Sequence, residues 1–273
     1  MPDYAGSTVL VTGASKGLGE AYARELASRG ADLVLVARSA DALERVARRI
    51  RAEHGVRVDV IAADLADREG LGALLQELDR ADGPIDLLIN NAGIGAVGPF
   101  LDGPLEPDLR SIDLNVTALI TLVHAIGGRM RARGRGGIIN VSSLAAFQPM
   151  PFQTTYAASK AFLLSFTEAL SEELRGTGVR VMAAHPGPVQ TGFFDATTAE
   201  VPPDADSPES VAAKTLDDFA RGRTNSYPGR ASRRLGTLPA RFLPRRAVVR
   251  LAGGFTRRAG FAEARNSEAP EGR

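Results

Sequence analysis

The chain has 273 residues, of which 44% are hydrophobic and 24% charged, and it contains no cysteine. These values are ordinary for a globular protein with one large domain or two small ones, and they exclude disulfides and thiolate chemistry. The N-terminus has no basic run followed by an apolar segment, and no stretch of about 18 apolar residues is present. We therefore expect a cytoplasmic protein without a signal peptide or transmembrane helix, and we predict no metal site.

The net charge of +1 hides an uneven distribution along the chain. Residues 221–273 hold 13 arginines, no lysine and three glutamates, a net charge of +10, so residues 1–220 carry −9. Such an arginine-rich segment either meets an acidic partner or a membrane, or folds back on the acidic part of its own chain. Nucleic acid is not expected, because no aromatic residues alternate with the arginines. We predict a folded domain over 1–220 and a basic extension over 221–273 whose end, beyond Asn266, is disordered.

The first two thirds of the chain alternate between strand-like and helix-like segments. Strands are predicted where short apolar runs end in glycine or a polar residue, and helices where apolar residues recur every three or four positions. The predicted strands cover 8–13, 32–38, 56–65, 85–93, 136–143 and 179–187, and the predicted helices cover 17–28, 41–55, 69–80, 105–130 and 154–175. This alternation predicts a doubly wound, Rossmann-like α/β domain with a parallel sheet of about seven strands. Ligands of such sheets bind beyond the carboxyl ends of the strands.

A glycine-rich loop, TGASKGLG, follows the first predicted strand. Gly13, Gly17 and Gly19 let the backbone turn tightly and approach a phosphate, and the following helix presents its positive N-terminus there. Ser15, Lys16 and Leu18 belong to the same loop. The spacing G-x-x-x-G-x-G differs from the G-x-G-x-x-G fingerprint, so the loop alone leaves open a glycine-rich turn without a ligand.

The second predicted strand ends at Arg38 without a carboxylate. An acidic residue at this place would hold the ribose 2′-hydroxyl of NAD. The guanidinium of Arg38 instead suits a 2′-phosphate, and Lys16 is placed to reach the same group. These two cations favour NADPH over NADH, and the alternative is that both are merely solvated.

Polar residues follow the remaining predicted strands. Asp64 and Leu65 are placed to meet an adenine, although Asp64 could equally cap a helix. Amides and small residues lie after the fourth strand, serines after the fifth, and a Pro-Gly turn after the sixth: Asn91, Ala92, Gly93, Ser142, Ser143, Pro186, Gly187, Val189 and Thr191.

The stretch YAASK places Tyr156 and Lys160 on one face of a predicted helix. A tyrosine four residues before a lysine also occurs by chance in many helices, so the pair gains meaning only from its surroundings. The pair is accompanied by six further motifs: TGASKGLG, Asp64, NNAG, Asn115 in DLNV, Ser143 in INVSS and Thr191 after PG. In this order and spacing, the motifs resemble those of the short-chain dehydrogenase/reductase family over residues 7–195.

The resemblance implies hydride transfer between NADP(H) and a carbonyl or alcohol substrate, with the cofactor supplying the hydride chemistry. It implies that Tyr156 donates the proton, its pKa lowered by Lys160 and the oxidised nicotinamide, and that Lys160 also binds the ribose. Ser143 is expected to hold the substrate oxygen, Asn115 a relay water, and Thr191 the carboxamide. Residues 193–210 are expected to form a substrate flap, and the helices over 105–130 and 154–175 to pair subunits in a dimer or tetramer.

The substrate is expected to be a lipophilic ketone or aldehyde, because the candidate wall residues of the pocket are apolar: Ile94, Phe147, Met150, Phe152, Phe193 and Phe194. The extension contains a basic amphipathic helix, with Arg246, Arg250 and Arg257 opposite an apolar side made of Val248, Leu251, Ala252, Phe255, Ala259 and Ala262. This apolar side either packs on the substrate site or another subunit, or lies on a membrane. The alternatives to a carbonyl reductase are a non-catalytic NADPH-binding sensor or scaffold and an epimerase or dehydratase.

Overall fold

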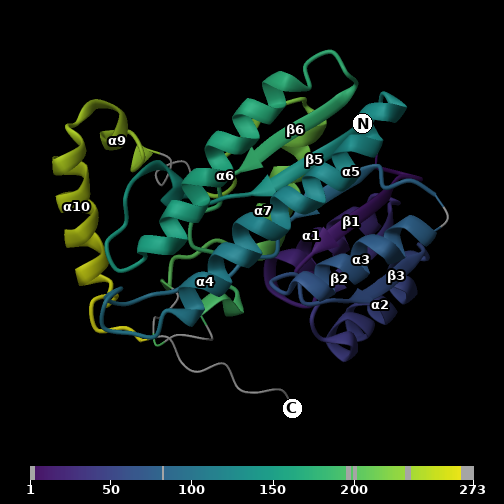
Figure 1. Ribbon diagram of the computed structural model, residues 1–273. Coiled ribbons are helices and arrows are strands. Elements are labelled where there is room, and N and C mark those ends of the chain that lie inside the picture. The colour runs from purple at the N-terminus through teal and green to yellow at the C-terminus, as the bar shows by residue number, and fades with distance from the viewer. Residues whose placement is uncertain (1–3, 82, 195–197, 199–201, 231–234, 266–273) are drawn as a thin grey trace.

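The computed structural model describes residues 4–81, 83–194, 198, 202–230 and 235–265. Its centre is a sheet of seven parallel strands in the order β3-β2-β1-β4-β5-β6-β7 (Figure 1). The expected disorder beyond Asn266 lies outside the described residues, as does the side chain of Phe194. The parallel strands confirm the predicted fold class, because consecutive parallel strands must be joined by crossover connections.

Six strands lie within the predicted ranges, and five of them are buried at all, or all but one, of their residues, as expected for strands covered on both faces. They are β1 (Thr8–Thr12), β2 (Asp32–Ala37), β3 (Val58–Ala62), β4 (Leu87–Asn90), β5 (Gly136–Val141) and β6 (Val179–Ala184). The seventh, β7 (Asn225–Ser226), has only two residues and pairs with β6. It lies within the segment 221–273, so the start of that segment contributes to the sheet.

Helices cover both faces of the sheet. One face carries α1 (Gly17–Ser28), α2 (Ala40–His54) and α7 (Pro208–Ala220), whose buried side chains share one core with the strands. The other face carries α3 (Arg68–Arg80), α5 (Leu119–Arg133) and α6 (Thr154–Glu173) around a second core. This two-sided covering is the doubly wound arrangement that the sequence predicts.

The long helix predicted over 105–130 is made of three parts. The segment α4 (Glu106–Ile112) continues into the π-helical η1 (Asp113–Ala118) and then into α5. By length and composition, residues 106–133 could span a membrane, which differs from the sequence-based expectation. Leu119, Leu122 and Ile126 of this helix are buried in the second core, and such apolar faces are typical of a core helix.

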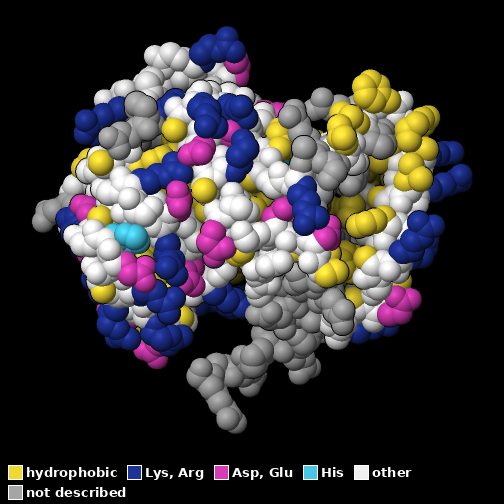
Figure 2. All heavy atoms as spheres, turned by 180° about the vertical axis from the view of Figure 1, so that it is seen from behind, with side chains coloured by type: hydrophobic (Ala, Val, Ile, Leu, Met, Phe, Trp, Pro, Cys, Tyr) yellow, Lys and Arg dark blue, Asp and Glu magenta, His cyan; other side chains and the backbone are white. Residues whose placement is uncertain are grey.

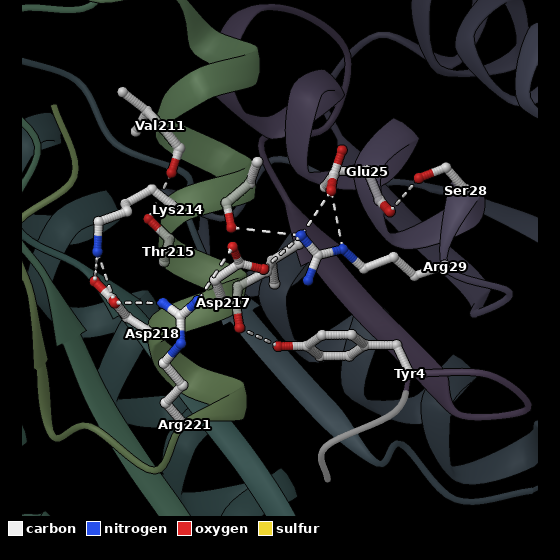
Figure 3. A network of polar contacts seen from close by, with 12 residues as sticks. Tyr4, Glu25, Ser28, Arg29, Val211, Lys214, Thr215, Asp217, Asp218 and Arg221 are labelled. Atoms are coloured by element: carbon white, nitrogen blue, oxygen red, sulfur yellow. Dashed lines mark hydrogen bonds and ion pairs between the residues drawn. The ribbon is translucent and has the colours of Figure 1, made fainter.

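A polar network joins the N-terminal segment and α1 to α7 (Figure 3). Arg29 bonds Glu25 on its own helix and pairs with Asp217 of α7 at 2.9 Å. The hydroxyl of Tyr4 donates to the carbonyl of Leu216 at 2.7 Å. The sequence analysis did not predict α7, although Ser207 caps it and Pro208 begins it, as is common at helix starts.

The basic extension forms α9 (Pro239–Phe242) and α10 (Arg245–Arg258) at one side of the molecule (Figure 1). Val248 and Ala252 of the predicted apolar side are buried, whereas Leu251, Phe255 and Ala259 are exposed, so only part of that side packs on its own domain. The packed face is centred on Ala252 and includes Gly253, whose missing side chain lets the helix approach Pro151. The predicted apolar side was based on hydrophobic residues alone, so it did not include the close backbone contact at Gly253.

Candidate active site

The candidate site lies where the strand order reverses, between β1 and β4, the place where open α/β sheets bind ligands. Gly13 has a left-handed backbone (φ +67°), and a Cβ there would lie 2.9 Å from Cα of Ala92. A Cβ on Gly19 would overlap the carbonyl oxygen of Gly13. The glycines therefore allow the loops after β1 and β4 to touch, and the N-terminus of α1 opens beside them, as a phosphate site requires.

Thr12, at the end of β1, holds the loop after β4 in place and was not singled out from the sequence. Its hydroxyl oxygen accepts the backbone N–H groups of Asn91 and Ala92, both at 3.0 Å, and its carbonyl accepts the side-chain amide of Asn91 at 2.9 Å. A threonine at a strand end beside a glycine loop is the only signal that the sequence offered. The hydroxyl fixes Asn91, Ala92 and Gly93 beside the glycine loop.

We expect Thr12→Val to destabilise the protein by about 2 kcal/mol, because valine has the same shape but removes the side-chain acceptor of the part-buried N–H of Ala92 and one of the two acceptors of the N–H of Asn91. The free energy of unfolding from urea denaturation measures this. Thr121→Val is the matched control, since the exposed hydroxyl of Thr121 bonds only its own helix. An equal loss in both variants would contradict the role given to Thr12.

The basic residues predicted to bind a 2′-phosphate are exposed on the same rim. Lys16 precedes α1 and donates to the carbonyl of Gly192 at 3.4 Å. Arg38 follows β2 and lies close enough to Asp64 to lower the pKa of that carboxyl. A Cβ on Gly17 would meet the side chain of Thr191 at 3.1 Å, so Thr191 borders the glycine loop, and its role at the carboxamide stays a prediction.

Asp64 forms an ion pair with Arg110 of α4, a partner that the sequence analysis missed. Burial alone would raise the pKa of the Asp64 carboxyl, but hydrogen bonds from Arg110 and from the amide of Ala66 lower it below its ordinary value. The cap of α3 is Asp67, which accepts the N–H of Gly70 at 2.9 Å. Asp64 is therefore not the helix cap, and its role at an adenine stays a prediction, while the Leu65 side chain lies in the core.

The structure brings Ser143, Tyr156 and Lys160 together at the carboxyl end of β5. Ser143 caps the short η2 (Leu144–Phe147), and its hydroxyl is hydrogen-bonded to the hydroxyl of Tyr156. The Lys160 ammonium lies 5.8 Å from the centre of the Tyr156 ring and donates to the carbonyl of Val141 at 2.9 Å. Ser143 follows β5, and Tyr156, 13 positions later, lies with Lys160 on α6. The three side chains form one polar group at the site.

Burial sets the protonation of this group. Burial raises the pKa of Tyr156, and the hydrogen bond from Ser143 opposes that shift only in part. Burial also lowers the pKa of Lys160 to about 8. The sequence predicts a tyrosine pKa lowered by Lys160 and the oxidised nicotinamide, whereas in the protein without cofactor burial has the larger effect and raises it. Near neutral pH the tyrosine is thus a protonated phenol that can donate its proton.

Asn115 lies in the π-helical turn η1 and is buried. Its amide accepts the N–H of Ile94 at 3.0 Å and donates to the carbonyl of Ile94 at 2.9 Å and to the hydroxyl of Ser159 at 3.0 Å. The side-chain amide of Asn115 has partners in the protein on both its oxygen and its nitrogen, and the relay water expected at this residue stays a prediction. Asn115 ties the loop after β4 to the helix that carries Tyr156 and Lys160. Single π-turns often mark such functional positions.

Residues after β5 and β6 complete the floor of the site. The hydroxyl of Ser142 donates to the carbonyl of Lys160 at 2.9 Å, so it positions the helix α6 rather than facing a ligand. His185, which was not predicted, bonds Asn225 at 2.9 Å, and burial lowers its pKa to about 4. Pro186 is buried at the end of β6, and Gly187 and Val189 lead to Thr191 at the glycine loop.

The apolar residues predicted to line the pocket have different surroundings. The ring of Phe193 packs on Tyr156 with centroids 5.3 Å apart. Phe147 packs edge-on against His185 at 5.0 Å, and Phe152 lies under the guanidinium of Arg257 from α10. Ile94 and Met150 are partly buried. Phe193 is therefore the aromatic residue next to Tyr156, while Phe152 connects the site to the extension.

Comparison with known proteins gives a consistent result. The short chain dehydrogenase family model matches residues 7–202. The ketoacyl reductase HetN of Nostoc sp. is 39% identical over 215 residues, which are 78% of this chain and 75% of that protein. A short chain dehydrogenase of Pseudocercospora fijiensis is 37% identical over 68% of this chain, and the chain spans only 60% of that protein's length.

Two solved structures share the fold and about a third of the aligned sequence. A short-chain dehydrogenase from Sphingobium yanoikuyae in complex with NADPH is 36% identical, with a TM-score of 0.79 over 86% of this chain and 93% of that one. A bulky-bulky ketone specific alcohol dehydrogenase from Comamonas testosteroni is 33% identical, with a TM-score of 0.74 over 87% and 99% of the two chains. With the Ser143, Tyr156 and Lys160 group in place at the strand ends, the chain belongs to the short-chain dehydrogenase/reductase family of oxidoreductases.

Proposed function

We propose that this protein is an NADPH-dependent oxidoreductase that reduces a lipophilic ketone or aldehyde to an alcohol. The observation that carries the proposal is the hydrogen bond between the hydroxyls of Ser143 and Tyr156, with buried Lys160 behind the ring. A buried phenol beside a second hydroxyl can bind and protonate one carbonyl oxygen, which is what carbonyl reduction requires.

When bound, the nicotinamide supplies the hydride to the carbonyl carbon. The residues of this chain handle the oxygen: the Ser143 hydroxyl donates a hydrogen bond to it, and Tyr156 gives it a proton as negative charge develops. The Lys160 ammonium is held at the carbonyl of Val141, where it favours the phenolate left after proton transfer. Asn115 keeps the loop carrying Gly93 against Lys160 through its bonds to Ile94.

The glycine loop and its rim fit a phosphorylated dinucleotide. The close approach of Gly13 to Ala92 leaves a cradle that a side chain would fill, and Arg38 and Lys16 supply positive charge where a 2′-phosphate would lie. No carboxylate follows β2 to hold a free 2′-hydroxyl. The NADPH held by the Sphingobium yanoikuyae relative supports the same choice of cofactor.

Replacing Arg38 with alanine is expected to raise the KM for NADPH by about 10-fold or more, with little change for NADH, because a charge-assisted hydrogen bond contributes about 1.5–3 kcal/mol. Initial rates with each cofactor test this. Arg45→Ala on α2 serves as the matched control, since Arg45 is also exposed but lies on the following helix. Parallel losses for NADPH and NADH in Arg38→Ala would contradict recognition of the 2′-phosphate.

The proposed substrate class follows from the wall of the site. Phe193 packs on Tyr156, and a Cβ on Gly95 would meet both rings within 3.2 Å. A carbonyl that reaches Tyr156 must therefore displace or slide along an aromatic side chain, which favours apolar substituents. The bulky ketone specificity named for the Comamonas testosteroni relative agrees with this choice.

We also propose that the protein pairs with a second copy through α4 and α6. Leu109, Ile112 and Phe162 are exposed on these helices, and Phe162 stacks on Phe166. Large apolar side chains on adjacent helix surfaces are typical of an interface between subunits. Light scattering tests the proposal: the mass should be two or four times the 28.8 kDa of one chain, and the mass of a monomer would refute it.

A further inference from the structure

The outer surface of the extension combines apolar and basic side chains, and the proposed reaction uses neither. Exposed apolar residues, here called the outer apolar surface, are Leu235, Leu238, Phe242, Leu243, Leu251 and Phe255. Phe242 is 81% exposed, and Leu251 and Phe255 are 59% and 62% exposed. Figure 2 shows hydrophobic side chains gathered at the side of the molecule that carries α9 and α10, next to a margin of Lys and Arg side chains. Such a cluster marks a binding surface.

The helix α10 is fixed on the domain, so this outer surface has a defined place. Val248, Ala252 and Thr256 are buried on its inner side. A Cβ on Gly253 would meet Pro151 at 3.2 Å, and the Arg257 guanidinium lies 5.4 Å from the centre of the Phe152 ring. These contacts occupy the inner face. Leu251 and Phe255 therefore point away from the packed side, and folding of the extension onto its own domain leaves them exposed.

The charge of the surface indicates what covers it. Residues 235–262 contain six arginines and no acidic residue. Of these, Arg245, Arg246, Arg250 and Arg258 are exposed on α10, and among the described residues no ion pair neutralises them. A symmetric contact with a second copy would bring this basic helix against itself. Like charges in contact oppose that arrangement, so a second copy is disfavoured as the occupant.

We propose that the outer apolar surface and the arginines of α10 dock the protein on an anionic membrane surface. Phenylalanine and leucine side chains enter the boundary between headgroups and acyl chains, while arginines reach the phosphates beside it. Each cation near an anionic leaflet contributes about 1 kcal/mol of attraction. Exposed apolar side chains supply the insertion into the bilayer, and the uncompensated arginines supply the attraction to its phosphates. An acidic soluble partner would need the arginines but not the exposed apolar side chains.

The docked helix lies next to the site. Its inner face contacts Pro151 and Phe152, which directly precede α6 and therefore Tyr156. The carbonyl of Phe152 also accepts the N–H of Gly98 at 2.9 Å, in the loop that follows β4. Membrane docking through α10 would place this edge of the site at the bilayer surface. Binding of this surface to a membrane does not depend on the proposed reaction.

The test is sedimentation of the full-length protein with vesicles of phosphatidylcholine, with and without phosphatidylglycerol. We expect binding to the anionic vesicles that weakens as salt is added. The double variants L251S/F255S and R250E/R258E should each lose about 10-fold or more in partition coefficient. The matched control is R45E/R48E, which reverses two exposed arginines on α2 and should bind as the wild type does.

Circular dichroism and NADPH binding should be the same in all of these proteins, because the substituted side chains are exposed and lie outside the cofactor loops. Equal binding to both kinds of vesicle, no binding to either, or an equal loss in the α2 control would overturn the proposal. A drop in solution mass for L251S/F255S would also overturn it, since the surface would then be an interface between subunits.

Discussion

Tyr156→Phe is expected to lower kcat for ketone reduction by about 10²–10⁴-fold, the usual contribution of a positioned general acid. Phenylalanine keeps the ring but removes the hydroxyl that is bonded to Ser143. The carbonyl oxygen would then develop negative charge without a proton donor. Affinity for NADPH should stay within about twofold, because the glycine loop, Arg38 and Lys160 are unchanged. Steady-state rates and a fluorescence titration of NADPH measure the two quantities separately.

The matched control is Tyr22→Phe. Tyr22 is also a buried tyrosine, but its hydroxyl bonds Thr215 of α7 at 3.1 Å, on the face of the sheet away from α6. Its loss should cost stability and leave kcat unchanged. If Tyr156→Phe kept wild-type turnover, or if both variants lost turnover equally, Tyr156 would not be the proton donor.

Lys160→Met is expected to make the protein without cofactor more stable at pH 7, by about 2 kcal/mol. Burial lowers the pKa of Lys160 from 10.5 to about 8, so holding the charged form inside the folded protein costs about 3 kcal/mol. Loss of the hydrogen bond to the carbonyl of Val141 offsets about 1 kcal/mol of the gain. A more stable variant would show that the protein keeps Lys160 for its function at a cost in stability.

The sign of the pH dependence separates this account from simple repacking. Between about pH 8 and 10.5 the unfolded chain binds the Lys160 proton and the folded protein releases it, so wild-type stability rises with pH through that window. The advantage of Lys160→Met should therefore shrink from pH 8 upward and be lost by about pH 10.5. Urea denaturation at several pH values measures this. An advantage that is constant with pH, or a less stable variant at pH 7, would contradict a buried charge.

The strands and the glycine loop could be predicted from the sequence, because their signals are local. The run from Thr8 to Thr12 is apolar and β-branched and ends at a glycine, which leaves little choice of conformation. The two-residue β7 has no such pattern and exists only because β6 offers it an edge. The helix α7 was missed, although Ser207 and Pro208 are ordinary start signals, because the surrounding segment was interpreted as a flap.

The residues of the site could be predicted individually, but not their contacts. Nothing local indicates that Arg110 pairs with Asp64, 46 positions away, or that Thr12 holds the loop at Asn91. The packed face of α10 could not be derived from hydrophobicity, because the close approach of Gly253 to Pro151 decided it. Such choices depend on tertiary packing, which a helical wheel does not contain.

The most direct test of the central claim compares NADPH consumed with alcohol formed, using the wild-type protein and a series of apolar ketones and aldehydes of increasing size. The account predicts one alcohol for each NADPH, with rates that are highest for bulky apolar substrates. Product formed without net consumption of NADPH would indicate an epimerase or dehydratase. Tight binding of NADPH without turnover of any substrate would indicate a sensor or scaffold, and either result would contradict carbonyl reduction.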